Sequence, residues 1–259
     1  MGLSFFDSAH WAASAFIEAL VLALVLRRDA FKQLPFFTVY LALLVTSEAA
    51  RCLAYEFAGI SSKISFDTYW ATQGLLILAR ATVVYEICRV LLSPYVGIWK
   101  FCRPLLIILG LILATGAGLT ARQRVNPIPE TTLMAERGLE LTVVGILIFG
   151  LIFCRYYGVR IDRHLAWIAL GLGFYSAVQV ANNTFLGNWF THEHFQIWNG
   201  LRMASFNIAT IFWLVAFWKP LPARQPVPVL LAHGEYEILA PQVTLRLREL
   251  NARLLEMWK

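Results

Sequence analysis

Acidic and basic side chains interrupt stretches of this sequence that are otherwise strongly apolar. Glu48 and Arg51 lie three residues apart in the segment TSEAARCLAYE, and Glu86 and Arg89 repeat this E-x-x-R spacing. On a helix, side chains three residues apart share a face, so each pair can neutralise itself. Around a hydrated hollow, the same arginines could bind an anionic or zwitterionic ligand, because the planar guanidinium matches a carboxylate or phosphate.

The overall composition indicates that these charges belong to a membrane protein. The chain has 259 residues, of which 59% are hydrophobic and 15% charged, and its mean hydropathy is +0.63. A typical soluble domain is about half apolar and about one quarter charged. One water-soluble core cannot bury so much apolar surface, so we expect an integral membrane protein. The net charge of +6 fits basic cytoplasmic loops, and we expect no nucleic-acid partner.

Seven stretches within residues 1–218 are long enough to cross a bilayer, which takes about 20 predominantly apolar residues. Lys and Arg accumulate in cytoplasmic loops. Ten Lys and Arg residues lie in the loops after the first, third and fifth stretches and at the start of the tail. Only three lie in the opposite loops. We therefore predict an all-α membrane protein, a seven-transmembrane-helix bundle with the N-terminus outside and the C-terminus in the cytoplasm, in a bacterial inner membrane. The predicted spans are 8–26, 35–57, 67–92, 101–120, 134–156, 164–187 and 195–218.

The predicted spans contain many ionisable residues. Each charge at the centre of a bilayer costs about 2.5–3.5 kcal/mol on insertion scales, so these side chains should face inward and be paired. Polar residues from six of the spans converge on one zone in the middle and outer half of the bundle, which predicts an outward-facing polar pocket. The candidate ligand-binding residues are Glu48, Arg51, Arg80, Glu140, Asn183 and Arg202.

Two further groups of polar residues have separate interpretations. Glu18 and Glu48 fall near the middle of the bilayer, where they are candidate proton-titrating groups. All of these polar groups also have a structural interpretation, in which they only hold the helices together; interhelical hydrogen bonds are often worth less than ~1 kcal/mol each. Toward the cytoplasm we expect a polar cluster of Glu86, Arg89, Arg103 and Arg155.

Signals for metals, cofactors and catalysis are weak. The loop THEHF contains His192 and His194, and His10 is expected on the same side, so these three are the candidates for a zinc or copper site. Exposed histidines are the simpler interpretation, and we expect no metal. Retinal needs a lysine inside the last span, which instead carries Arg202 and reaches Lys219 only at its end. We expect no cofactor and no enzymatic activity.

The C-terminal part divides into a linker and a helix. Residues 219–240 contain KPLPARQPVPV, which is typical of a stiff extended linker, and a candidate hairpin around His233 and Gly234. Residues 241–259 predict a cytoplasmic amphipathic helix with apolar residues at coiled-coil spacing. This helix can lie on the membrane, fold back on the bundle, pair in a homodimer or bind a cytoplasmic signalling partner. Its seam consists of Val243, Leu247, Leu250, Leu254 and Met257.

Four stretches carry a resemblance to known membrane proteins: RRDAFKQLPFF, VVYEICRVLLSPY, GLGFYSAVQVANN and FWLVAFWKPLP. In these stretches the chain is similar to a set of uncharacterised bacterial seven-helix membrane proteins. It also loosely resembles the seven-helix sensory modules that precede bacterial signalling domains. The resemblance covers most of the membrane part and implies its architecture, but it implies no activity.

These observations favour a receptor- or sensor-like protein that binds a small anionic or zwitterionic ligand in an outward-facing pocket and signals through its C-terminal tail. Two alternatives stay open. A transporter or proton-coupled carrier would use Glu18 and Glu48 as titrating groups. A structural subunit of a larger complex would bind no small molecule and would use its buried charges only for packing.

Overall fold

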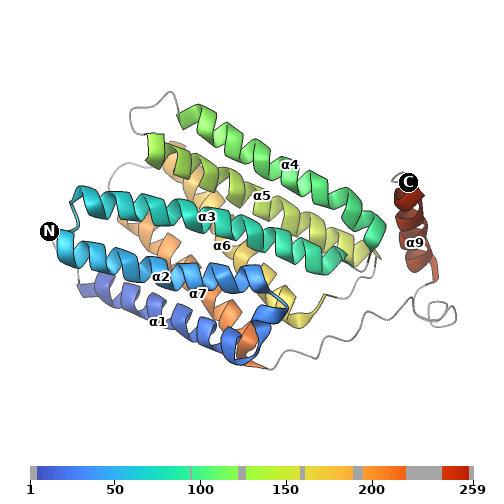
Figure 1. The fold of residues 1–259 in the computed structure, drawn as a ribbon, viewed down its shortest axis with the longest axis horizontal. Coiled ribbons are helices and arrows are strands. Elements are labelled where there is room, and N and C mark those ends of the chain that lie inside the picture. The colour runs from blue at the N-terminus through green and yellow to red at the C-terminus, as the bar shows by residue number, and fades with distance from the viewer. Residues whose placement is uncertain are drawn as a thin grey trace.

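A computed structural model provides the coordinates of the chain. It describes residues 5–93, 95–121, 127–157, 161–188, 195–219 and 241–256. Within these ranges, some residues, mostly near helix ends, are described by their backbone alone. Every regular element in the described residues is a helix (Figure 1). The expected hairpin around His233 falls in residues 220–240, outside the described part of the chain.

The long helices follow the predicted apolar stretches, and several continue beyond them. Pro35 opens α2 and Pro127 opens α5, positions where the missing proline N–H would have no helical partner anyway. Ser62 precedes α3 and accepts a hydrogen bond from the N–H of Ser65 at 3.1 Å, which caps that helix. The elements are α1 (Phe5–Arg27), η1 (Ala30–Lys32), α2 (Pro35–Ala58), α3 (Lys63–Leu92), α4 (Val96–Ala121), α5 (Pro127–Tyr157), α6 (Arg163–Asn188), α7 (Phe195–Trp218) and α9 (Pro241–Glu256).

Five helices of the described chain are long and apolar enough to cross a membrane: α2, α4, α5, α6 and α7. This finding, with the all-helical fold, is compatible with the predicted integral membrane protein. α3 is less apolar, because charged residues recur along its 30 residues from Lys63 to Arg89. The seven-span count, the orientation and the inner membrane stay predictions.

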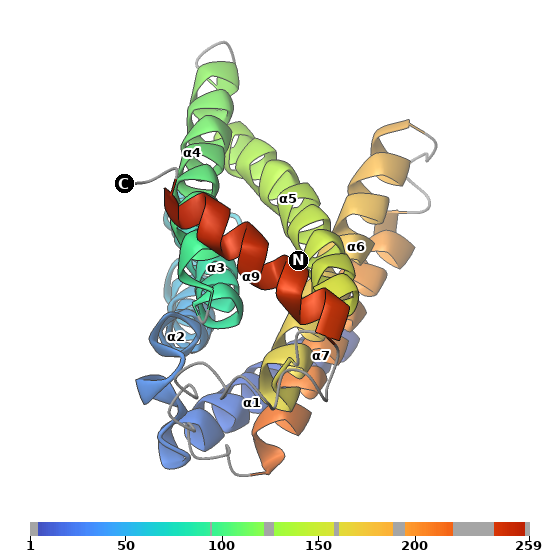
Figure 2. The same ribbon diagram turned by 90° about the vertical axis from the view of Figure 1, so that its right-hand side faces the viewer.

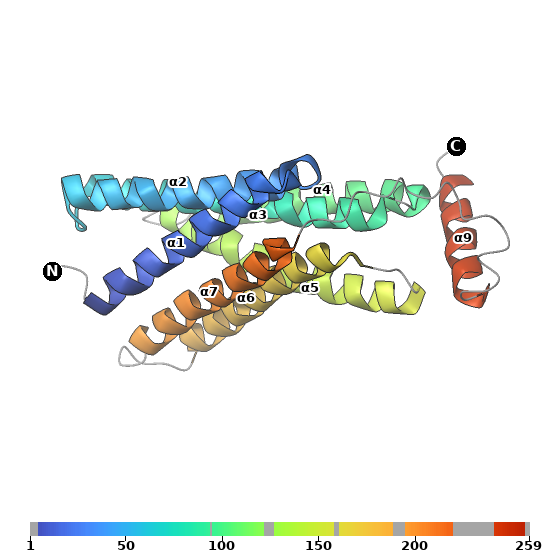
Figure 3. The same cartoon turned by 90° about the horizontal axis from the view of Figure 1, so that it is seen from below.

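Six of the helices form a closed ring. α1 contacts α2 and α7, and the ring continues from α7 through α6, α5 and α3 back to α2. In Figure 3, α2 and α3 lie on one side and α6 and α7 on the other. α4 packs outside this ring against α3 and α5 (Figure 2). Only 11% of the apolar stretch Gly97–Gly116 of α4 is buried inside the protein, compared with 44% of the stretch Arg163–Asn182 of α6. The ring helices are the six that carry the polar residues expected to face inward.

An aromatic core fills the ring near η1. Trp213 of α7 is 1% exposed, and its ring meets those of Phe37 and Tyr40 edge to face, with centroids 5.5 and 5.9 Å apart. Its indole N–H donates to the carbonyl of Ile168 on α6 at 3.3 Å. A Cβ added at Gly171 would lie 2.6 Å from Nε1 of Trp213. Glycine at this position therefore allows α6 and α7 to pack closely around the indole.

Candidate functional site

Arg51 on α2 connects side chains from two helices. Its Nη1 donates to Oε1 of Glu48 one turn earlier, at 3.2 Å, so the local pair expected from the E-x-x-R spacing is present. Its Nε donates to Oγ1 of Thr72 at 2.9 Å, and its Nη2 donates to Oε1 of Gln73 at 3.2 Å, both on α3. The indole N–H of Trp11 on α1 donates to the other oxygen of Glu48. Two guanidinium nitrogens of Arg51 thus join α2 to α3, and the third binds Glu48 within α2.

The contacts continue across the ring through Gln73. Its Nε2 donates to Oε1 of Glu136 on α5 at 3.1 Å. The same oxygen lies 3.5 Å from Nη2 of Arg202 on α7. We call Glu48, Arg51, Gln73, Glu136 and Arg202 the polar chain. With Trp11, it joins five of the six ring helices by side-chain contacts, so a change at one end can affect helices on the opposite side.

Arg80 and Glu140 form a second, more deeply buried unit. The guanidinium of Arg80 on α3 pairs with Glu140 on α5, and their side chains are 3% and 0% exposed. On its other side, the guanidinium carbon lies 4.9 Å from the ring centroid of Tyr175 on α6, which is a cation–π contact. The hydroxyl of Tyr175 accepts a hydrogen bond from Gln179 at 2.7 Å. This unit therefore links α3, α5 and α6.

Glu18 on α1 is the buried acid that differs from the others. It is 2% exposed, and its Oε2 has no hydrogen-bond partner among the described residues. One turn earlier, Ser14 donates a hydrogen bond to Asn207 on α7. The three arginines of the two units each pair with one glutamate, whereas Glu18 forms no ion pair within the described chain.

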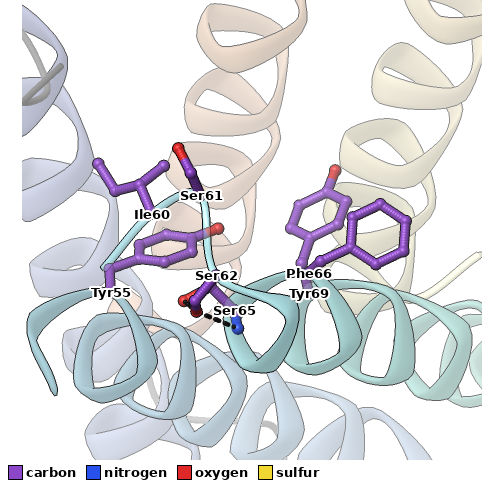
Figure 4. Close-up of a pocket in the computed structure, with 7 residues that line it drawn as sticks. All are labelled: Tyr55, Ile60, Ser61, Ser62, Ser65, Phe66 and Tyr69. Carbon is purple, nitrogen blue, oxygen red and sulfur yellow. Dashed lines mark hydrogen bonds between the residues drawn. The ribbon is translucent and has the colours of Figure 1, made fainter. Parts of the chain in front are cut away.

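A surface depression lies where α2 passes into α3. It is lined by residues from the end of α2, the connecting turn and the first two turns of α3 (Figure 4). Aromatic rings form part of its wall, and serines of the turn add hydroxyl groups. We call it the tyrosine depression; its lining residues are Tyr55, Ile60, Ser61, Ser62, Ser65, Phe66 and Tyr69.

Arg51 also connects the tyrosine depression to the polar chain. Its guanidinium carbon lies 4.8 Å from the centroid of the Tyr69 ring, in cation–π geometry. Tyr69 is one turn before Thr72, which accepts a hydrogen bond from Arg51. Tyr55 is one turn after Arg51 on α2. None of the five predicted ligand-binding residues with described side chains lines the depression. Among these five, only Arg51 has a described contact with one of its walls.

Glu86, one of the residues expected to form a cytoplasmic-side cluster, is held by the backbone of another helix. Glu86 is 2% exposed, and its two oxygens accept hydrogen bonds from the backbone N–H groups of Phe36 and Phe37 at 3.0 and 2.8 Å. It therefore caps the N-terminus of α2 from α3. Arg89 and Arg103 are exposed, and the side chain of Arg155 is outside the described part of the chain.

Several other predicted residues also fall outside the described side chains: Asn183, His10, His192 and His194, and Val243, Leu247, Leu254 and Met257 of the seam. Among the described residues, no group of three His, Cys, Asp or Glu side chains is placed to hold a metal ion. Leu250, the remaining seam residue, is partly exposed on α9.

Gln73 and Glu136 were not among the predicted site residues, although both belong to the polar chain. Glu136 lies near the start of the predicted span, where a charge is easily assigned to the membrane surface. The available signal was helical spacing. Glu136 is four residues before Glu140, and Gln73 is seven residues before Arg80, so each shares a helix face with a predicted inward residue.

The arrangement suits binding and coupling between helices. Acid–base pairs and amides hold one another in place, and Arg51 connects them to an open depression. Comparison of the chain with protein-family models, with curated proteins and with solved structures found no match.

Proposed function

We propose that the chain is a receptor-like, non-enzymatic membrane protein that binds a small ligand with a carboxylate at the tyrosine depression. The observation that carries this proposal is the position of Arg51, which stacks on a wall of the depression while its nitrogens bond to Glu48, Thr72 and Gln73. In the proposed topology the depression opens to the outside, because the turn from α2 to α3 is an outer loop.

The ligand would compete with Glu48 for Arg51. A carboxylate can form two parallel hydrogen bonds with a guanidinium, whereas Glu48 accepts only one hydrogen bond from Arg51, at 3.2 Å. Both side chains of this pair are only partly buried, with exposures of 11% for Arg51 and 17% for Glu48. The Arg80–Glu140 pair is fully enclosed and lacks such access. Arg51 is therefore better placed to change partners than Arg80, and it contacts the Tyr69 wall of the depression directly.

The response would pass through the polar chain. A ligand shifts an equilibrium only by binding one conformation better than another. A conformation in which Arg51 turns toward the depression would release Glu48 and Gln73, and Gln73 holds Glu136 next to Arg202 on α7. α7 leads directly into the C-terminal segment, which makes it the route by which a signal would reach the cytoplasm.

A binding screen on the purified protein tests this proposal. We would measure thermal unfolding in detergent micelles with a panel of amino acids and small mono- and dicarboxylates. Arg51→Gln should weaken binding of any hit by roughly tenfold or more, as expected for loss of a charge-assisted contact. Arg89→Gln removes an exposed arginine of α3 and should leave binding unchanged. Equal binding by wild type and Arg51→Gln would contradict the proposal.

A proton-coupled carrier is the second candidate, and the surroundings of Glu18 favour it. A buried carboxyl oxygen without a hydrogen-bond partner is costly when charged, which is typical of a group that binds and releases a proton. In proteoliposomes, uptake of a panel substrate should then depend on a pH gradient and be lost in Glu18→Gln. Ligand binding without uptake would support the receptor. If the protein neither binds nor transports any compound of the panel, and a partner co-purifies with it stoichiometrically, the structural alternative is supported.

A further inference from the structure

The C-terminal helix α9 packs across the ends of α4 and α5 (Figure 2). Its Asn251 supplies the contact that defines this position: Oδ1 accepts a hydrogen bond from the backbone N–H of Gly97 at 2.6 Å. Gly97 is the second residue of α4, so its N–H is one of those that have no partner within the helix. A side chain of α9 thus caps the N-terminus of α4.

The close approach of the two helices depends on the absence of a side chain at Gly97. A Cβ added there would lie 2.4 Å from the backbone oxygen of Asn251 and 2.7 Å from its Oδ1. The first of these is a backbone atom, which cannot turn away as a flexible side chain can. At Gly110, on the same helix, an added Cβ would have no atom within 4 Å. Of these two glycines of α4, only Gly97 at the start of the helix is closely approached by α9.

The side of α9 that faces the bundle includes part of the predicted coiled-coil seam. Leu250 and Asn251 are partly covered, while a separate face that includes Leu245 and Arg253 is exposed. Seam positions 247 and 254 lie three and four residues from these covered positions, so they share a side of the helix. The side of α9 that would pair with a second copy is therefore the side that docks on α4 and α5.

We propose that α9 is a two-position latch: it docks on α4 and α5 within one chain, or it pairs with α9 of a second copy, and each position excludes the other. A helix of 16 residues is marginal in water without a partner for its apolar side. The heptad spacing of the seam makes a second copy of this chain the occupant after release. This proposal goes beyond ligand binding and does not rest on it.

Gly97→Val in the full-length protein, in detergent micelles without ligand, tests the latch. The added side chain should displace α9 and raise the dimer fraction, measured by crosslinking at fixed concentration, by roughly tenfold. Amide hydrogen exchange at position 97, measured relative to the intrinsic rate of the residue present there, should become faster, because Asn251 no longer accepts the hydrogen bond from that N–H. Gly110→Val is the matched control and should change neither quantity. Adding Leu250→Lys to Gly97→Val should abolish the dimer.

Two results would overturn the proposal. In Gly97→Val, an unchanged relative exchange rate at position 97 and an unchanged dimer fraction would mean that the glycine contact does not hold α9. Faster exchange without any dimer would mean that a second copy is not the occupant. If Gly97→Val fails to fold, Asn251→Ala keeps the glycine, removes only the hydrogen bond and should shift both quantities in the same direction. A failed ligand screen would leave these outcomes unaffected.

Discussion

Arg80 of α3 pairs with Glu140 of α5 in the interior of the six-helix ring, where the exposure of the two side chains is 3% and 0%. No other ion pair among the described residues is so completely enclosed. The attraction between the two charges offsets the cost of removing both from water. Each partner is therefore tolerated in the interior because the other is present.

Removing one partner of this pair should be far more harmful than removing both. Arg80→Leu or Glu140→Leu alone leaves an uncompensated buried charge and should lower the free energy of unfolding by about 3–5 kcal/mol. The double variant leaves no lone charge, so its loss should be much smaller than the sum of the two single losses. Denaturant unfolding in detergent micelles, followed by circular dichroism, measures these values. Additive losses would show that the two charges do not depend on each other.

Glu86 should stabilise the start of α2 through its two backbone contacts. Glu86→Ala leaves the N–H groups of Phe36 and Phe37 without their acceptors and should cost about 1–2 kcal/mol of unfolding free energy. Glu86→Gln keeps one acceptor oxygen and should cost less. Amide hydrogen exchange at Phe36 and Phe37 should become faster in both variants. Arg89→Ala, an exposed neighbour on α3, should leave this exchange unchanged; an equal effect there would argue against the cap.

Gly171 should be intolerant of a side chain. In Gly171→Ala the new Cβ would lie 2.6 Å from Nε1 of Trp213 and 2.9 Å from the backbone oxygen of Ala209. Overpacking of this kind costs about 1–3 kcal/mol. Gly145→Ala on α5 meets no atom within 4 Å and should be neutral or slightly stabilising. Thermal unfolding of both variants tests the difference, and equal melting temperatures would contradict the close α6–α7 packing.

The proposed orientation can be tested by labelling engineered cysteines in intact cells. Ser61→Cys lies in the turn between α2 and α3 and should react with a membrane-impermeant maleimide from outside. Lys32→Cys follows α1 and should react only after the membrane is permeabilised. The opposite pattern would reverse the orientation, and labelling of both from one side would contradict an α2 span. The background variant replaces the native cysteines Cys52, Cys88, Cys102 and Cys154.

The helices could be predicted from the sequence because helix formation and membrane burial depend on local properties. Apolar stretches such as 35–57 have the length and hydropathy of a membrane span, and the structure has α2 over Pro35–Ala58. The Glu48–Arg51 pair was also predictable, since three-residue spacing on one helix brings the two side chains together. These predictions require no knowledge of which helices are neighbours.

The partners of the remaining charges were decided only by the tertiary structure. Local spacing offered Arg89 as the partner of Glu86, but the packing of α3 against the start of α2 presents two backbone N–H groups to that carboxylate. Arg202 meets Glu136 because α7 and α5 lie across the same ring. Such contacts depend on the order and rotation of the helices around the ring. One amino-acid sequence sets the polarity of each helix face, but the neighbour of that face is settled only when all the helices pack together.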